Sequence, residues 1–74
     1  MEIIFVGSET KTINTEFMVS RELIEDGRFL IRFELIESKV KEIFFASKTL
    51  MENAFELITQ SLIDGIKTLT IECL

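Results

Sequence analysis

A turn between two apolar runs constrains the fold of this chain more than any other feature. Every second residue from Phe29 to Leu35 is apolar, and this period of two is typical of a β-strand. Asp26-Gly27 comes before this run. An Asp-Gly pair between apolar runs is a strong hairpin signal, because glycine adopts a positive φ at little cost. The sequence therefore predicts an antiparallel β-hairpin that turns at residues 26 and 27.

The length of the turn decides which side chains of the hairpin share a face. A two-residue turn would place Arg21 opposite Arg32 and leave each face mixed. A three-residue loop over residues 25–27, with Gly27 in the left-handed conformation, separates the apolar side chains from the polar ones more completely. We predict this register, which brings Glu22 and Ser20 near Arg32 and places Phe17, Val19, Leu23, Phe29, Ile31, Phe33 and Leu35 on one face.

Two strands are predicted before the turn. Glu2–Val6 is a short run rich in β-branched and aromatic residues, and Gly7-Ser8 ends it. Residues 8–12 are polar and predict a turn or loop. From Ile13 onward, apolar and polar residues alternate, which predicts the first strand of the hairpin. A helix over residues 16–25 is the alternative, because Glu, Met, Arg and Leu favour helices.

Two further strands are predicted after the hairpin. Residues 40–46 form one of them, with the side chains of Phe44 and Phe45 on opposite faces. The other is residues 67–73, in which apolar residues alternate with Thr and Glu. This pattern is typical of a half-buried strand.

A helix is predicted between these two strands. Thr49 and Glu52 have capping-box spacing, in which each side chain satisfies a free backbone donor of the other residue. Asp64-Gly65 provides the stop signal. The predicted core stripe of the helix is Met51, Ala54, Phe55, Ile58 and Leu62.

These elements give the order β-β-β-β-α-β in a single domain, residues 1–74. One amphipathic helix over a sheet is the economical arrangement for such a chain. We therefore predict an α+β two-layer sandwich with a mostly antiparallel sheet of about five short strands. The link between the helix and the last strand is short, so that strand is expected beside the helix and against the first strand.

The charge of the chain restricts its partners. The net charge is −5, and both nucleic-acid backbones and anionic membrane surfaces repel such a chain. Neither nucleic acid nor a membrane is therefore expected as the main partner. Both ends of the chain are acidic, so an acidic rim could face a basic protein. Ordinary solubilising charge is the alternative explanation.

The apolar content predicts association with another chain. Hydrophobic residues make up 47% of the sequence, yet a domain this small buries only about 60% of its unfolded surface. Some apolar side chains must then stay outside or contact a second chain. This favours a homodimer or a hydrophobic partner, with scattered surface apolar residues as the alternative.

The single cysteine, Cys73, excludes an intramolecular disulfide and is typical of a reducing setting. No basic segment follows Met1, so no secretory signal is expected. Charged residues also interrupt every apolar run before the roughly 18 residues that a membrane-spanning helix needs. We expect a cytoplasmic protein.

The inventory of reactive side chains argues against catalysis. Histidine is absent, which removes the commonest general base, and one cysteine without histidine cannot form the usual zinc site. Glu22, Glu25 and Asp26 lack the alternating ligand pattern of a calcium loop. Gly7-Ser8 lacks the lysine and the further glycines of a phosphate loop. We expect no enzyme activity, cofactor or metal, and we expect Cys73 in the core.

The candidate partner-binding residues surround the hairpin turn. They are Glu22, Glu25, Asp26 and Arg28, together with Glu37, which is expected to lie nearby. We predict that these five residues contact a protein partner. Turn formation alone also explains Asp26, so its presence permits a binding site without requiring one.

The segments MEIIFVG and LIDGIKTLTIEC, a strand opening and a helix–turn–strand close, carry a resemblance. The chain resembles the small, acidic, cysteine-poor proteins that tailed phages make early in infection to neutralise host enzymes, which include anti-defence inhibitors, antitoxins and anti-CRISPR proteins. The resemblance implies a stoichiometric inhibitor that acts by binding. It implies no functional residue, because the proteins of this group share a general sequence character but no common site.

The leading hypothesis is a non-catalytic intracellular binding protein, expected to be a homodimer, that inhibits or sequesters a protein partner through an acidic and apolar surface. One alternative is an oligomer that binds a nucleotide-like signal between subunits. It would need Arg21, Arg28, Arg32 or Lys41 in a shared pocket. The other alternative is a structural assembly subunit.

Overall fold

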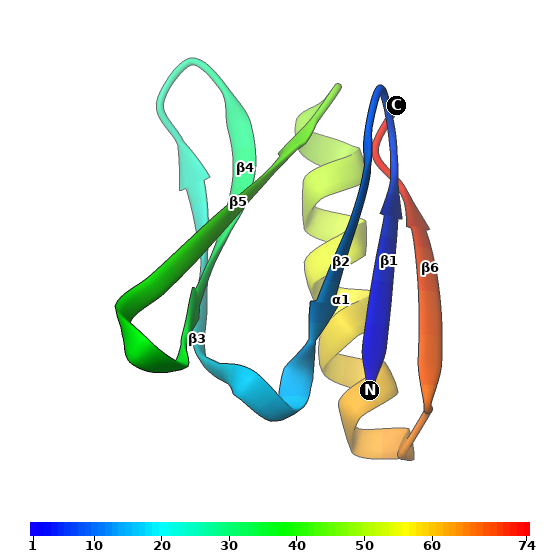
Figure 1. The fold of residues 1–74 in the computed structure, drawn as a ribbon. Helices are drawn as coiled ribbons and strands as arrows, with labels where there is room; N and C mark the ends of the chain where they lie inside the picture. Colours follow the sequence, from blue (N-terminus) through cyan, green and yellow to red (C-terminus); the bar gives the residue numbers. More distant parts are fainter.

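The computed structural model describes residues 1–74 and shows one helix and six strands (Figure 1). The predicted α+β class is confirmed. The elements are β1 (Glu2–Val6), β2 (Thr10–Asn14), the 3-10 turn η1 (Thr15–Phe17), β3 (Met18–Glu25), β4 (Phe29–Leu35), the 3-10 turn η2 (Ile36–Ser38), β5 (Lys39–Phe45), α1 (Lys48–Asp64) and β6 (Thr68–Glu72).

The strands form two three-stranded sheets, which corrects the prediction of one sheet with about five strands. In the first sheet, β1 lies between β2 and β6, antiparallel to β2 and parallel to β6. The second sheet is an antiparallel meander of β3, β4 and β5. The additional strand is β2, whose β-branched threonines suit a strand although the first part of the segment was expected to be a loop.

The predicted first strand of the hairpin is interrupted by η1. The side chain of Asn14 accepts a hydrogen bond from the backbone N–H of Glu16 at 3.0 Å, which stabilises a turn in place of the strand. Here the chain passes from the first sheet to the second. Phe17 is therefore 49% exposed, and Val19 lies in a bulge of β3 and is 63% exposed. The prediction that both side chains share the face of the hairpin with Phe29, Ile31, Phe33 and Leu35 is wrong.

The hairpin of β3 and β4 is present, but its loop lies one residue later than predicted. The loop comprises residues 26–28 rather than 25–27, and Glu25 pairs with Phe29. Gly27 has a φ of 89°, the left-handed conformation predicted for it. Because the pairing is shifted by two positions and not by one, residues 20–25 and the residues of β4 keep the faces predicted for them, whereas Phe17 and Val19 do not.

The helix begins earlier than the capping-box pattern predicted. Ser47 is the N-cap, and its side chain accepts a hydrogen bond from the backbone N–H of Leu50 at 3.2 Å, so the cap at Thr49 is wrong. Gly65 ends the helix with a φ of 71°, as predicted. The buried residues of the helix are Met51, Ala54, Ile58 and Ser61, whereas Phe55 is half-buried and Leu62 is exposed.

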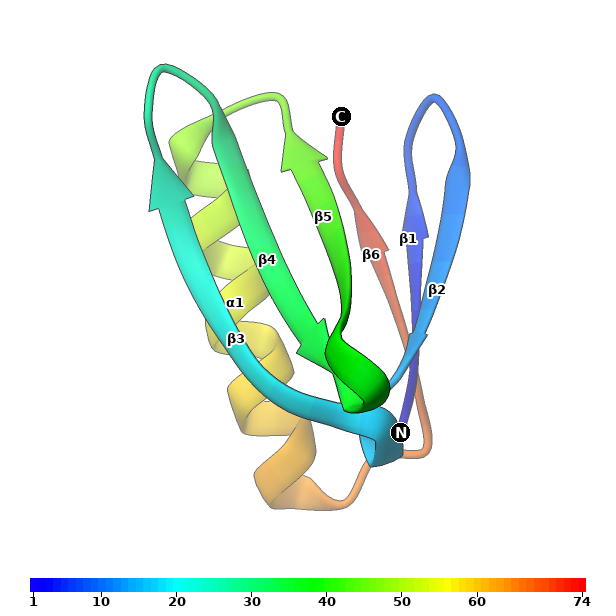
Figure 2. The same ribbon diagram turned by 60° about the vertical axis from the view of Figure 1, so that its left-hand side comes forward.

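The buried stripe is rotated relative to the prediction because α1 contacts both sheets. It packs across β3, β4 and β5 and also against β6. Figures 1 and 2 show the helix on one side of the molecule, alongside both sheets. No helix has the length and the apolar character that a membrane crossing requires.

One core joins the two sheets and the helix. The ring of Phe5 on β1 lies 5.6 Å from the ring of Phe33 on β4 and 6.4 Å from the ring of Phe45 on β5, measured between centroids. Cys73 extends the same core past the end of β6. Burial of these side chains therefore stabilises the two sheets as one unit.

Replacing Phe5 tests this connection. We expect Phe5→Leu to lower the free energy of unfolding by about 1–2 kcal/mol, because the smaller side chain leaves a gap between the sheets. Phe17→Leu is the matched control and should change it by less than about 0.5 kcal/mol, because Phe17 is half exposed and outside the core. Urea denaturation monitored by circular dichroism measures both. Equal losses would contradict a central role for Phe5.

Candidate functional site

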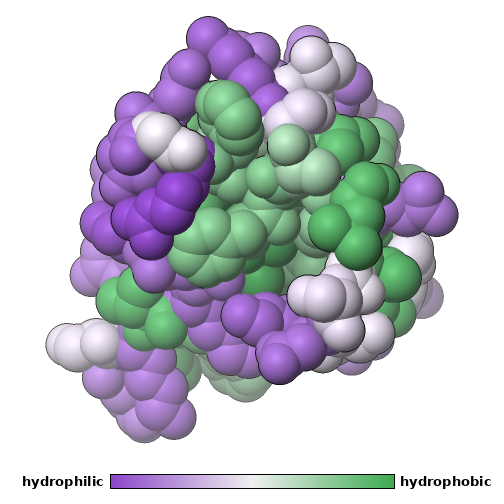
Figure 3. Space-filling model, turned by 90° about the horizontal axis from the view of Figure 1, so that it is seen from above, coloured by the Kyte–Doolittle hydropathy of each residue, from purple (hydrophilic) through white to green (hydrophobic).

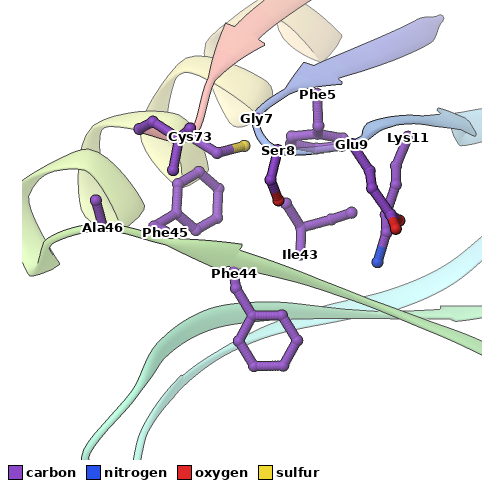
Figure 4. A pocket seen from close by; sticks show the side chains of 11 residues that line it. Phe5, Gly7, Ser8, Glu9, Lys11, Ile43, Phe44, Phe45, Ala46 and Cys73 are labelled. Carbon is purple, nitrogen blue, oxygen red and sulfur yellow. The ribbon is translucent and has the colours of Figure 1, made fainter.

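An open cleft of about 250 Å³ lies between the β1–β2 turn, β5 and the C-terminal residues (Figure 4). Its apolar floor consists of Phe5, Ile43 and Phe45. Phe44 and Leu74 border it and are 46% and 73% exposed. We call this space the apolar cleft; the other residues that line it are Gly7, Ser8, Glu9, Lys11, Ala46 and Cys73.

The alternation of β5 places two aromatic rings differently around this cleft. Phe45 points into the core and Phe44 points to the outer face, as predicted for this pair. On the outer face, Phe44 lies opposite Leu30, and the guanidinium of Arg28 lies 5.6 Å from the centre of the Phe44 ring. The half-exposed ring therefore lies next to the hairpin of β3 and β4, on the other side of β5 from the floor of the cleft.

Cys73 lines the cleft, and its backbone links the two sheets. Its N–H donates to the carbonyl oxygen of Val6 on β1, and its carbonyl oxygen accepts from the N–H of Ala46 after β5, both at 2.9 Å. Burial raises the pKa of the Cys73 thiol, because the thiolate would lose hydration. The thiol is consequently a poor nucleophile, which agrees with the core role expected for it.

Seen from above, apolar side chains gather around a hollow at this end of the molecule, with hydrophilic side chains at its border (Figure 3). The β1–β2 turn, the turn of β3 and β4 and the start of α1 all lie at this end (Figure 1). We call it the cleft end. A partner that covered the cleft would therefore also lie close to the hairpin turn.

A second, shallow cleft of about 820 Å³ separates β2 from β5. It shares Lys11 and Phe44 with the apolar cleft, so the two are continuous. The ammonium of Lys41 donates a hydrogen bond across it to the carbonyl oxygen of Thr12 at 3.1 Å. We call this space the seam; its lining residues are Thr10, Lys11, Thr12, Val40, Lys41, Glu42 and Phe44.

Of the predicted partner-binding residues, Glu25, Asp26 and Arg28 lie together at the hairpin turn, at the cleft end. Asp26 and Arg28 form two hydrogen bonds, at 2.8 and 3.2 Å, and a carboxylate oxygen of Glu25 lies 3.3 Å from the ammonium of Lys48. The hydrogen bond from Arg28 lowers the pKa of the Asp26 carboxyl. The acids of the turn are therefore neutralised within the protein.

The other two predicted residues lie apart from the turn. Glu22 is on the outer face of the second sheet, where an oxygen lies 3.4 Å from the guanidinium of Arg32. The predicted proximity of these two residues is confirmed. Glu37 lies in η2, at the end of the molecule opposite the hairpin turn (Figure 2), and its oxygen is 3.8 Å from the ammonium of Lys39. The expectation that Glu37 lies near the turn is wrong, because the length of β4 separates the two.

The basic residues required by the nucleotide-binding alternative do not share a pocket. Arg21 lies on the helix side of β3, where it donates to the hydroxyl of Thr59 at 2.6 Å and lies over the ring of Phe55. Arg28 and Arg32 are held by carboxylates on the second sheet. Lys41 alone reaches the seam. This arrangement does not favour an anion site within one chain.

The chemistry available in the two clefts is limited. Glu9 and Lys11 are the charged residues of the apolar cleft, and no group of three or more His, Cys, Asp or Glu side chains could hold a metal ion. The sequence reasoning missed Phe44, Leu74 and Lys11 as surface residues of a cleft. The adjacent Phe44-Phe45 pair was the available signal, because in a strand one ring must face away from the core.

Comparison with protein-family models, with curated proteins and with solved structures finds no match to this chain.

The ion pair at the turn gives a measurable titration. We expect the Asp26 carboxyl to titrate below the ordinary aspartate pKa in the folded protein, and Arg28→Gln to return its pKa toward the ordinary value. A carboxyl pKa that is lower in the folded than in the unfolded state stabilises the protein at pH values above the unfolded-state pKa. This stabilisation is lost as the pH falls through the folded-state pKa. Carboxyl ¹³C NMR measures the titration. An unchanged pKa in Arg28→Gln would contradict the assigned cause.

Proposed function

We propose that this chain is a small non-catalytic binding protein that inhibits or sequesters a protein partner in the cytoplasm, and that the partner binds at the cleft end. The observation that carries the proposal is the apolar cleft, in which the exposed side chains of Phe44 and Leu74 lie beside a floor of buried aromatic and aliphatic side chains. Desolvated aromatic and aliphatic anchors supply most of the energy of protein interfaces. The cleft has the size for one such side chain of a partner.

The distribution of polar groups supports binding over catalysis. The cleft contains one carboxylate, one ammonium, the Ser8 hydroxyl and a buried thiol with a raised pKa, and no hydrogen bond joins the hydroxyl or the thiol to the carboxylate as a nucleophile and base would require. The turn of β3 and β4 supplies a polar border on one side, through Glu25, Asp26 and Arg28. An apolar centre with a polar rim is the usual composition of a protein interface.

The surface also has apolar residues outside the cleft. Twelve large hydrophobic residues are exposed, which agrees with the sequence argument that so small a domain cannot bury all of its apolar side chains. We propose that a second copy of the chain covers part of this surface and that the protein acts as a homodimer. Light scattering on the purified protein measures the stoichiometry directly.

A pair of matched variants tests the cleft as the binding site. Leu74 and Ile63 are both 73% exposed, but Leu74 lines the cleft whereas Ile63 lies on α1. The partner is isolated with the tagged chain from its native cell, identified by mass spectrometry and purified. Leu74→Asp is then expected to weaken its affinity at least about tenfold in calorimetry, because the aspartate must be desolvated at the contact.

Ile63→Asp introduces the same charge and is expected to leave the affinity unchanged. Thermal melts of the free variants establish that both are folded. Equal affinities of the two variants for the purified partner would rule out the apolar cleft as the binding site.

Charge reversal tests the contribution of the turn. The double variant Glu25→Lys/Asp26→Lys should weaken partner binding and leave the melting temperature nearly unchanged, because both residues are exposed and exposed ion pairs contribute little stability. Glu52→Lys/Glu56→Lys makes the same charge change on the outer side of α1 and is the control. If both double variants bind the partner as well as the original chain, the turn is not part of the interface.

A further inference from the structure

Two strand edges face each other across the seam without pairing. β2 is the end strand of the first sheet and β5 is the end strand of the second. No backbone hydrogen bond joins them. The bond from the Lys41 ammonium to the Thr12 carbonyl oxygen crosses the gap instead. An unpaired strand edge presents a row of N–H and C=O groups that another strand can bind.

The direction of the bonds on β1 shows which groups of β2 are free. Glu2 donates to the carbonyl oxygen of Lys67, and the carbonyl oxygen of Val6 accepts from Cys73, so even-numbered residues of β1 bond toward β6. Odd-numbered residues of β1 must then bond to β2, where their partners are Lys11 and Ile13. The backbone groups of Thr10 and Thr12 consequently point to the free edge. The contact from Lys41 to Thr12 agrees with this assignment.

The same argument identifies the free groups of β5. The hairpin bond from the N–H of Asp26 to the carbonyl oxygen of Arg28 shows that even-numbered residues of β4 bond to β3. Odd-numbered residues of β4 and β5 therefore bond to each other. The backbone groups of Val40, Glu42 and Phe44 remain, and they point away from β4 toward the seam.

The residues with free backbone groups are also the residues that line the seam. Thr10 and Thr12 line it from β2, and Val40, Glu42 and Phe44 line it from β5. The remaining two lining residues are Lys11 and Lys41. The seam is therefore an open groove with hydrogen-bonding backbone on both sides. It leads directly into the apolar cleft, because the two spaces share lining residues.

The charge of the seam differs in sign from that of the whole chain. The protein has a net charge of −5, but Lys11 and Lys41 have no carboxylate within ion-pair distance. Glu42, the acid that lines the seam, is held by the guanidinium of Arg32 at 2.8 Å. Glu9 lies farther along, in the apolar cleft. These two ammonium groups, which have no carboxylate partner within the protein, are complementary to a carboxylate of another molecule.

We propose that the seam binds an extended, acidic segment of the protein partner, which adds as a strand to β2 or β5. The proposal rests on the proposed function and names the part of the partner that binds. The main chain of the segment pairs with the free backbone groups, an apolar side chain enters the cleft, and an acidic side chain contacts Lys11 or Lys41. This is strand addition, in which the backbone supplies affinity and alternate side chains supply specificity.

The hydrogen bond from Lys41 to Thr12 occupies part of the edge to which a strand would bind. It satisfies the carbonyl oxygen that an incoming N–H would otherwise occupy, so the ammonium must leave that oxygen when a strand pairs with β2. A carboxylate on the segment would then receive the released ammonium. The competing explanation is that both lysines protect the edges from pairing with other copies, a use of lysine known for edge strands.

A pair of peptides tests the proposal. The probe is a seven-residue peptide of alternating valine and glutamate with blocked ends, and the control replaces each glutamate by lysine. With the glutamate peptide, the backbone amides of Thr10 and Thr12 or those of Val40, Glu42 and Phe44 should shift in NMR spectra and exchange more slowly with deuterium. The lysine peptide should leave them unchanged. Absence of protection at both edges would overturn the proposal.

Matched variants test the lysines. Lys11→Gln/Lys41→Gln should weaken binding of the glutamate peptide several-fold, and the loss should shrink at high salt. Lys39→Gln/Lys67→Gln removes the same charge away from the seam and should have no such effect. If the seam variant instead binds the peptide as well as the original chain and self-associates in light scattering, the lysines only protect the edges and the proposal fails.

Failure of the strand-addition proposal can be distinguished from failure of the proposed function. Loss of partner affinity in Leu74→Asp supports the cleft as the partner site whether or not a strand is added. If that loss is observed while the edge amides gain no protection with the purified partner, the strand-addition proposal alone is wrong.

Discussion

Contact between the ring of Phe5 and the aromatic rings of the second sheet is the interaction on which the rest of the structure depends. Each three-stranded sheet needs another element to cover its apolar face, because a sheet is stable only when that face is buried. Phe5 reaches both Phe33 and Phe45, and α1 packs against strands of both sheets. A chain of 74 residues thus obtains one core from two sheets.

This way of closing the core also creates the candidate site. The sheets are joined at the cleft end by the backbone of Cys73 and in the middle by the side chain of Lys41, but not by a continuous ladder between β2 and β5. A closed barrel would have removed these edges. Here they remain open beside the floor of the apolar cleft. The fold therefore leaves its backbone donors and acceptors and its exposed aromatic side chain in the same region.

Local patterns predicted the elements of this fold well and their arrangement less well. The alternation from Phe29 to Leu35, the positive φ of Gly27, the helix stop at Gly65 and the pairing of the last strand with the first were all correct. The division into two sheets was not predicted. It depends on the Asn14 turn, a short-range hydrogen bond inside a segment whose alternation is also compatible with one long strand. The apolar cleft could not be predicted either, because it forms between residues distant in sequence.

The ionic contacts explain why the acidic residues of the hairpin turn are weaker evidence of a partner-binding site than the sequence suggested. Five of the thirteen acids, including all those predicted as contacts, have a basic partner within 4 Å, and four of the eight basic residues are their partners. The unpaired residues are then eight acids and four bases, so they carry −4 of the net −5. Two of those four bases line the seam. A partner of positive net charge would be attracted at long range, while the seam itself favours a carboxylate. The net charge of the protein therefore favours a partner of positive net charge, whereas the two lysines of the seam favour an acidic segment within that partner.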